Sequence, residues 1–378
     1  MFDYATLKVI WWLLVGILLI GFAIMDGHDM GVGILLPILG KDDTERRVMI
    51  NSVAPHWDGN QVWFITAGGA IFAAWPFVYS VAFSGMYWAL LLVLFALFFR
   101  PVGFEYRSKL PNPQWRKSWD LGIFMGSAVP ALVFGVAFGN LFEGVPFILD
   151  DTMRSFYSGS FWALLNPFAL LCGAVSLAML TLQGATYLAH RTEGNLKHRV
   201  EKLIFYIIPV LLICFSLAGY FVMSMDGFAI KSIADVGSSI NPSMKEVVLQ
   251  KGAWLGNFNQ LPLLWIIPAS AYLASGIIFV AVKTGKSLVA FIGSSIVCAS
   301  VILTAGVSLF PFVLPSSELP GVSLTVWDAA SSYVTLKVMF VVALIFTPIV
   351  LAYTGWAYRV MRGKVTGEYI RINDKMLY

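Results

Sequence analysis

Nine long apolar stretches recur along this chain and constrain its fold more than any other feature. A helix needs about 20 apolar residues to cross the hydrocarbon core of a bilayer, where the backbone must satisfy its own hydrogen bonds. Hydrophobic residues make up 58% of the 378 residues and charged residues only 12%, which excludes an ordinary cytosolic domain, a disordered chain and a nucleic-acid-binding protein. We therefore expect an all-α polytopic membrane protein. The expected spans lie near residues 8–38, 48–73, 77–99, 119–141, 160–188, 202–224, 261–282, 288–312 and 334–358.

The distribution of lysine and arginine tests this number of spans. If the chain crosses the membrane nine times, 19 of its 25 lysines and arginines fall on the side of the C-terminus and six on the side of the N-terminus. Positive charge gathers on the cytoplasmic side of membrane proteins, so we expect a cytoplasmic C-terminus and a periplasmic N-terminus. A miscounted span would exchange later loops between the two sides and blur this asymmetry.

The spacing of the spans predicts a single integral membrane domain over residues 1–378. Residues 1–142 would form a first bundle that carries the polar cluster described below, and residues 160–358 would supply the remaining spans. The stretch 225–260 is too long for a tight turn and too polar to cross, so we expect an external, periplasmic loop there. The N-terminus lacks the basic region and cleavage site of a signal peptide, which indicates a retained first span.

Ionisable side chains inside the expected spans are the main functional signal. Each costs at least about 2.5 to 3.5 kcal/mol to insert, so each needs a partner, a cavity or a function. The first span places Asp26 and Asp29 on one helical face, the second holds His56 and Asp58 about two to three turns from its start, and Arg100 closes the third. Because consecutive spans alternate in direction, these residues approach the same cytoplasmic depth. We expect a proton path from the cytoplasm through this group.

Other interpretations of the same residues stay open. Arg100 could instead form a buried ion pair with Asp29 or Asp58 that fixes helix register and exchanges no proton. His28 or His56 could ligate a haem, although four histidines, two of them in a cytoplasmic loop, are a thin supply of axial ligands. His56 and Asp58 lie two positions apart and do not share a helix face, so we expect no metal site.

Several long motifs make the chain resemble a known family. They are residues 22–33 (FAIMDGHDMGVG), 51–63 (NSVAPHWDGNQVW), 98–107 (FFRPVGFEYR), 310–317 (FPFVLPSS) and 324–329 (LTVWDA). Over essentially the whole chain, including its length and number of spans, the sequence resembles subunit II of the bacterial cytochrome bd quinol oxidases. It looks most like the proteobacterial members, whose usual electron donor is ubiquinol.

The resemblance implies a fold, an activity and partners. The fold is two four-helix bundles plus one peripheral helix in the bacterial cytoplasmic (inner) membrane. The complex oxidises quinol, reduces O2 to water with cytoplasmic protons and so contributes to membrane potential. Haem b and haem d are bound mainly by the partner, subunit I, and subunit II supports their assembly without being catalytic alone. A structural quinone in this subunit, as in some members, and a small single-span subunit are left open.

The resemblance also suggests roles for single residues. It places Asp58 on the proton route, Asp29 and Arg100 at supporting polar positions, and Trp63 near the route of oxygen. Together with the cluster inferred above, the expected proton pathway comprises Asp58, Asp29, Asp26 and His56, with Arg100 as charge support. His28 has no family role that we can assign.

Two other classes of function fit the intramembrane charges on physical grounds. An independent proton-coupled transporter also needs buried acids, but it favours inverted repeats around a midplane site, and the repeat signal here is weak. A purely structural scaffold would use the same charges to fix assembly.

Overall fold

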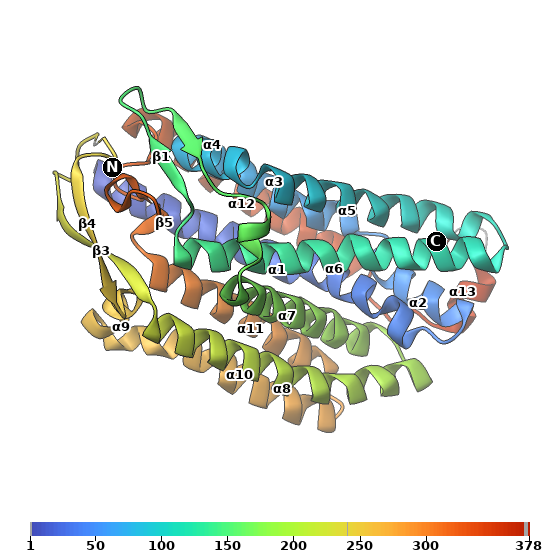
Figure 1. Ribbon diagram of the computed structural model, residues 1–378. Helices are drawn as coiled ribbons and strands as arrows, with labels where there is room; N and C mark the ends of the chain where they lie inside the picture. The colour runs from blue at the N-terminus through green and yellow to red at the C-terminus, as the bar shows by residue number, and fades with distance from the viewer. Residues whose placement is uncertain (1, 240, 374–376) are drawn as a thin grey trace.

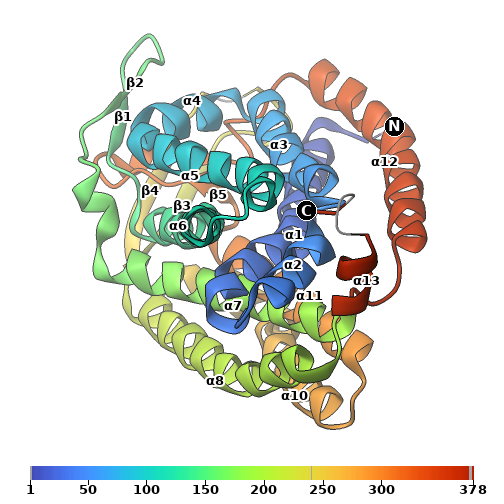
Figure 2. The same cartoon turned by 90° about the vertical axis from the view of Figure 1, so that its right-hand side faces the viewer.

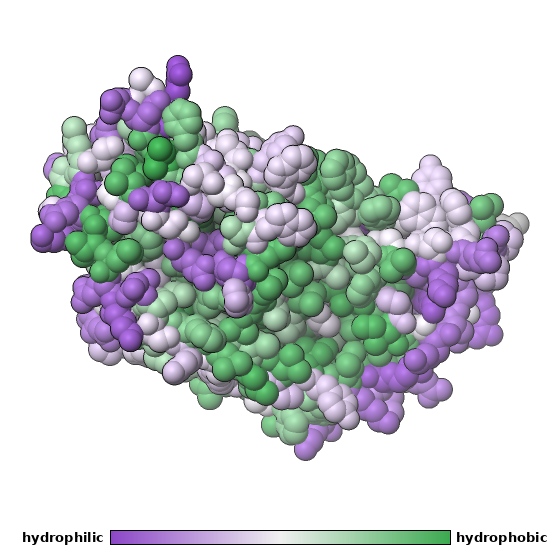
Figure 3. Space-filling model, in the orientation of Figure 1, coloured by the Kyte–Doolittle hydropathy of each residue, from purple (hydrophilic) through white to green (hydrophobic). Residues whose placement is uncertain are grey.

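The computed structural model describes residues 2–239, 241–373 and 377–378 and shows long helices that run side by side along one direction (Figure 1). Within these residues, eight helices are long and apolar enough to cross a membrane, and the bent pair α3 and α4 makes a ninth candidate. The spanning helices are α1 (Tyr4–Leu39), α3 (Trp57–Ala74), α5 (Tyr87–Tyr106), α6 (Pro113–Glu143), α7 (Pro167–Arg191), α8 (Gly194–Ser224), α10 (Ile266–Lys283), α11 (Ser287–Leu309) and α12 (Tyr333–Val360). A band of hydrophobic side chains separates the polar ends in Figure 3. The expectation of an all-α polytopic membrane protein with about nine spans is confirmed.

The spanning helices form two groups and one outlier. Helices α1, α3, α5 and α6 pack together, and α7, α8, α10 and α11 form a second group joined to the first through α1, α6 and α7. Helix α12 stands apart and touches chiefly α1 and α3, as Figure 2 shows in the view along the helices. The two ends of the chain lie at opposite ends of the bundle (Figure 1), as an odd number of spans requires.

Close packing around α1 depends on glycine. A Cβ atom added to Gly31 would lie 2.2 Å from the carbonyl oxygen of Leu180 and 2.7 Å from the Cα of Gly184. Only glycine lets α1 and α7 approach this closely, as in other membrane helix pairs. On another side of α1, a Cβ at Gly33 would lie 2.1 Å from the hydroxyl of Ser127 in α6. The polar residues of α1 are therefore held in a rigid crossing of three helices.

The second and third spans differ from the expected ranges of 48–73 and 77–99. Residues from Asp43 to Val53 form a separate short helix, α2, whose N-cap Asp42 accepts a hydrogen bond from the backbone of Glu45. The second span starts only at Trp57 and ends at Ala74. Pro76 then begins α4 (Pro76–Gly85), which is bent by 119° from α3 because the residue before a proline disfavours helical geometry. The third span is α5, ten residues later than expected at its start.

The remaining elements lie outside the spans. Three antiparallel strand pairs occur at the end that holds the N-terminus: β1 (Phe147–Leu149) with β2 (Ser155–Tyr157), β3 (Asp226–Ile233) with β4 (Lys245–Lys251), and β5 (Phe312–Leu314) with β6 (Leu324–Thr325). The stretch expected to form a loop, 225–260, thus contains a hairpin followed by the short helix α9 (Gly256–Gln260). At the opposite end, α13 (Gly367–Ile372) packs against α2.

One lysine fastens α1 to this N-terminal end. Lys8 is fully buried, and its Nζ donates to the carbonyl oxygens of Val236, Ser238 and Trp327 at 2.6 to 3.0 Å. The ammonium group therefore joins the β3–β4 hairpin and the segment before α12 to the first helix.

Candidate functional site

The buried ionisable groups gather near the end of the bundle that holds the C-terminus. Five helices supply them, because α1 and α7 run toward this end, α3 starts there, and α5 and α12 finish there (Figures 1 and 2). We call these groups, together with the amide of Asn60, the polar cluster. Its members are Asp26, His28, Asp29, His56, Asn60, Arg100, Tyr187 and Tyr358. The sequence-based expectation that α1, α3 and α5 bring their polar residues to one depth agrees with this arrangement.

Arg100 and Asp26 form the most enclosed pair of the cluster. The guanidinium donates two hydrogen bonds to the carboxylate, at 3.0 and 2.6 Å, and both side chains are 1% exposed. Charged groups that leave water need such bidentate geometry to offset the cost of desolvation. The alternative interpretation placed Arg100 in a buried ion pair with Asp29 or Asp58. Arg100 does form a buried ion pair, but the suggested partners were wrong, because the partner is Asp26.

Asp29 lies beside this pair and faces α3. Its Oδ2 accepts a hydrogen bond of 2.8 Å from the side-chain amide of Asn60. The same amide nitrogen lies 3.0 Å from Nδ1 of His56, and the amide oxygen of Asn60 accepts a hydrogen bond of 2.8 Å from the hydroxyl of Tyr358. A continuous hydrogen-bonded chain therefore runs from α12 through α3 to the buried carboxylate on α1.

His28 occupies the space between α1 and α7. Its Nε2 lies 3.3 Å from Oδ1 of Asp29, and its ring stacks on Tyr187 with ring centroids 4.1 Å apart. Tyr187 also reaches His56, whose Nε2 is 2.9 Å from the tyrosine hydroxyl. His28, left without a role in the sequence analysis, is thus an integral member of the polar cluster.

Asp58 is not brought into the cluster. It is exposed in the first turn of α3, whereas His56 and Asn60, two residues before and after it, are buried. Residues two apart on a helix point in nearly opposite directions, so Asp58 faces outward from the bundle. Its carboxylate also lies where the N-terminal end of the helix dipole favours negative charge.

Trp63 lies deeper along α3 and packs onto α1. A Cβ at Gly21 would lie 2.3 Å from Cε3 of its indole, so the glycine makes room for the ring. Trp63 is partly buried and contacts the main hydrophobic core. It lies apart from the hydrogen-bonded chain described above, in an apolar environment.

Two members of the polar cluster were missed from the sequence. Tyr187 directly follows the polar run from Gln183 to Thr186 in α7, and Tyr358 lies near the end of the last span. Tyrosines near span ends are ordinarily interfacial anchors, so only the fold identifies these two as hydrogen-bonding partners.

The histidines of the cluster do not fit a haem. The rings of His28 and His56 are packed between Tyr187, Tyr358 and Phe291, with ring centroids 4.1 to 6.3 Å apart. This packing leaves no room for a porphyrin between the two imidazoles. We therefore derive no step of a reaction through a haem held by these residues.

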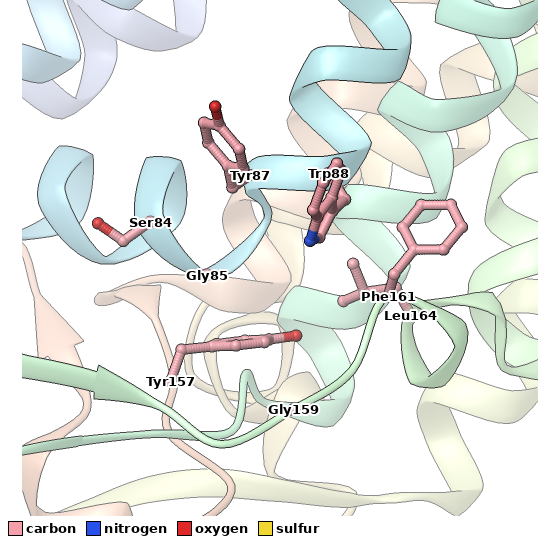
Figure 4. A pocket seen from close by; sticks show the side chains of 8 residues that line it. All are labelled: Ser84, Gly85, Tyr87, Trp88, Tyr157, Gly159, Phe161 and Leu164. Carbon is pink, nitrogen blue, oxygen red and sulfur yellow. The ribbon is translucent and has the colours of Figure 1, made fainter.

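A cavity of about 240 Å³ lies at the opposite end of the molecule, between the start of α5 and the β1–β2 hairpin. Figure 4 shows Tyr157 and Trp88 on two sides of it, with the tyrosine hydroxyl and the indole nitrogen toward the same space. The hydroxyl of Tyr157 has no hydrogen-bond partner among the described residues. No ionisable acid or base lines this cavity besides tyrosine, so it is separate from the polar cluster.

Comparisons with known proteins point to one family. Residues 7–361 match the model of cytochrome bd terminal oxidase subunit II. The chain is 56% identical to the cytochrome bd-I ubiquinol oxidase subunit 2 of Escherichia coli strain K12, over 100% of both chains. It is 33% identical to the cytochrome bd ubiquinol oxidase subunit 2 of Bacillus subtilis strain 168, over 96% of this chain and 98% of that protein.

A solved structure supports the fold. A chain from the bd oxidase of Geobacillus thermodenitrificans superposes with a TM-score of 0.67 at 15% identity, covering 96% of this chain and 99% of that chain. The full-length identity, the family match and the helical fold agree, and the chain belongs to the cytochrome bd terminal oxidase subunit II family.

Proposed function

We propose that this chain is the second subunit of a quinol:oxygen oxidoreductase and supplies access routes for protons and oxygen. It is a multi-pass protein of the inner membrane. In the proposal it packs against subunit I, which binds the b- and d-type haems and oxidises ubiquinol, and it supports assembly of those haems. Protons taken from the cytoplasmic side for the reduction of O2 to water would contribute to membrane potential. We assign no place to a quinone or to a small subunit.

The observation that carries the proton route is the hydrogen-bonded chain at Asp29. Its carboxylate is fully buried, yet Asn60 links it to Tyr358 and His56, which lie nearer the C-terminal end. Buried acids joined by hydrogen-bonding side chains are the usual components of intramembrane proton relays. In this proposal His56 and Asp29 exchange protons, and the Arg100–Asp26 pair holds the charge of the region fixed.

Asp58 would act on a separate face. Its carboxylate is exposed on the outer side of α3, where contact with lipid would be costly and a partner protein would cover it. We propose that subunit I covers this face and that Asp58 delivers protons to it from the cytoplasmic side. Asp26, grouped with the proton pathway on sequence grounds, is assigned to charge support because both of its oxygens are occupied by Arg100.

The test uses the purified complex with Asp58→Asn, Asp29→Asn and, as a control, Asp151→Asn at an exposed loop position at the other end of the molecule. Loss of a proton-transfer group lowers turnover by about 100-fold or more. We expect lower oxygen consumption and proton uptake in the first two variants, with haem content and subunit composition retained. Unchanged turnover in both variants would contradict the relay, and loss of the haems would favour a scaffold role.

Copurification tests the assembly itself. A pull-down of the chain from mildly solubilised membranes should recover a second large membrane subunit, and the reduced eluate should show b- and d-type haem bands. A colourless solitary protein would overturn the proposed partnership.

Trp63 is proposed to shape a hydrophobic route for oxygen. Its ring packs against Gly21 in an apolar part of α1 and α3. Replacement of Trp63 by Ala should change the apparent KM for O2 without changing the apparent KM for ubiquinol. An equal change in both constants would indicate a general disturbance and contradict this role.

A further inference from the structure

We propose that His28, Asp29 and His56 form a binding site for one divalent transition metal ion. The sequence predicts no metal site, because His56 and Asp58 do not share a helix face. The fold instead brings a histidine and an aspartate of α1 against a histidine at the start of α3. A bound ion would take the place of the proton that His56 and Asp29 exchange in the proposed route, so the ion and the proton exclude one another at these atoms. This inference does not rest on the proton route, because metal binding can be measured directly.

The hydrogen bonds of His28 fix which ring nitrogen carries its proton. Nδ1 lies 2.9 Å from the carbonyl oxygen of Ile24, which can only accept, so Nδ1 must donate. In the neutral ring Nε2 is therefore a bare lone pair. That lone pair faces Oδ1 of Asp29 at 3.3 Å.

His56 is fixed in the same way through Tyr187. The tyrosine hydroxyl donates its proton to the carbonyl oxygen of Ser52 at 2.9 Å, so it accepts from Nε2 of His56, also at 2.9 Å. The other ring nitrogen, Nδ1, then carries a lone pair and lies 3.8 Å from the same Oδ1 of Asp29. Histidines that bind metals usually donate a hydrogen bond from the ring nitrogen that does not bind the metal, and this hydrogen bond fixes the tautomer.

Three acceptor atoms therefore converge on one point. Nε2 of His28 and Oδ1 of Asp29 are buried and have no hydrogen-bond partner among the described residues. In the described part of the chain, no lysine or arginine nitrogen lies within 4.0 Å of Asp29. Buried lone pairs without a donor are costly, and a cation between them removes that cost.

The spacing suits a tetrahedral ion. Metal–nitrogen and metal–oxygen bonds of about 2.0 to 2.2 Å at tetrahedral angles place the ligand atoms about 3.3 to 3.6 Å apart. The two separations from Oδ1 of Asp29 are 3.3 and 3.8 Å, and all three ligand atoms lie within 4.8 Å of one another. A water molecule would complete the coordination.

Neighbouring groups provide support and a way in. On binding, Asn60 would keep its hydrogen bond to Oδ2 of Asp29 and give up the one to Nδ1 of His56. Tyr358 covers the imidazole of His56, with ring centroids 4.7 Å apart, and comes from the loosely packed α12. The ion would reach the site from the end of the bundle where His56 lies.

The ligand set selects the class of ion. Two neutral imidazoles and one carboxylate suit Zn²⁺ and similar first-row ions, whereas Mg²⁺ prefers oxygen ligands alone. Zn²⁺ is therefore the probe and Mg²⁺ the negative control.

The experiment measures zinc in the purified complex. Wild type, His28→Phe and His198→Phe are treated with a chelator, loaded with Zn²⁺, desalted and analysed for metal per chain. His198 is a matched control because its side chain is 70% exposed on α8, far along the chain from the cluster. We expect wild type and His198→Phe to retain one more zinc than His28→Phe, and no variant to retain Mg²⁺.

X-ray absorption at the zinc edge of the wild-type complex keeps the proposal testable even if His28→Phe fails to assemble. Two nitrogen ligands and oxygen ligands at about 2.0 to 2.2 Å support the site. Equal zinc in wild type and an assembled His28→Phe, no retained zinc in wild type, or zinc with oxygen ligands alone would each overturn it. The first two results would mean that a proton alone occupies the cluster.

Discussion

The guanidinium of Arg100 is bound to the carboxylate of Asp26 by two hydrogen bonds, at 2.6 and 3.0 Å, in the interior of the helix bundle. The two residues lie on α5 and α1, which do not follow one another in the chain. The pair therefore joins helices in the half of the membrane where the polar cluster lies.

Removal of one member of this pair should be costly. In Arg100→Gln the carboxylate of Asp26 keeps its burial but loses its counterion, which typically destabilises a protein by about 3 to 5 kcal/mol. We expect a lower melting temperature and a lower yield of assembled complex. The double variant Asp26→Asn/Arg100→Gln should recover part of the loss. A single variant as stable as wild type would show that the pair does not hold the helices.

Gly31 should tolerate no side chain. In Gly31→Ala the new methyl group meets the backbone of Leu180 and Gly184, so α1 and α7 must separate, at a cost of about 1 to 3 kcal/mol. Gly16→Ala on the same helix is the matched control, because its Cβ meets no atom within 4 Å. Thermal unfolding of the purified complex should show a lower melting temperature for Gly31→Ala alone. Equal melting temperatures would contradict the close helix contact.

Glu45 makes a pH-dependent contact between α2 and α8. Burial opposes ionisation, but hydrogen bonds from Arg199 and from backbone amides outweigh it and hold the pKa of Glu45 below its usual 4.5. A lowered pKa stabilises the folded state above about pH 4.5, and this contribution is lost as the pH falls through the folded-state pKa. Glu45→Gln should therefore cost about 0.5 to 1 kcal/mol at pH 7, because both side chains are partly exposed.

Melting temperatures at pH 7 and pH 4 check this prediction. The difference between wild type and Glu45→Gln should shrink at the lower pH. Glu368→Gln, at an exposed position of α13, serves as control and should differ little from wild type at either pH. A difference that grows on acidification would reverse the predicted sign.

The sequence predicts the number of spans, because each long apolar run has one stable structure in lipid. It cannot predict how each helix is rotated. Arg100 could have met any of three aspartates, and only the arrangement of the helices in the fold selects Asp26. Asp58 and Asn60 are near neighbours in the same motif, yet one faces outward and the other faces Asp29.

The bend between α3 and α4 shows a second limit. Apolar residues continue through Trp75 and Pro76, so hydropathy alone begins the third span within α4. Hydropathy also joins the end of α2 to α3, which places the start of the second span too early. The proline marks a break, but its position does not predict the angle of 119° or the contacts of α4 with β2 and β5. Contacts between residues distant in the sequence are a further limit. Tyr358 donates to Asn60 on α3, which is 298 residues away, and no local pattern predicts that hydrogen bond.

Lys245 and Asp328 form a fully buried ion pair outside the spans. The ammonium lies 2.8 Å from Oδ2 of the aspartate and joins the β3–β4 hairpin to the segment that leads into α12. Burial lowers the pKa of Lys245, and the charge of Asp328 opposes that shift. Burial likewise raises the pKa of Asp328, against the effect of Lys245. Each charge therefore depends on the other.

Asp328→Asn should leave the buried ammonium without its counterion and destabilise this end by about 3 to 5 kcal/mol near neutral pH. Without Asp328, the folded-state pKa of Lys245 would fall further below 10.5. Between that lowered pKa and 10.5 the folded state binds fewer protons than the unfolded state, so the free energy of unfolding increases with pH in this range. We expect the melting temperature of Asp328→Asn to recover partly between pH 8 and pH 10, a range that lies just below the ordinary pKa of lysine, about 10.4. Lys231→Met removes an ion pair with Glu246 on the same hairpin, but those side chains are exposed, so it should change little at any pH. If Asp328→Asn and Lys231→Met melted alike, the buried pair would contribute no more than the exposed one.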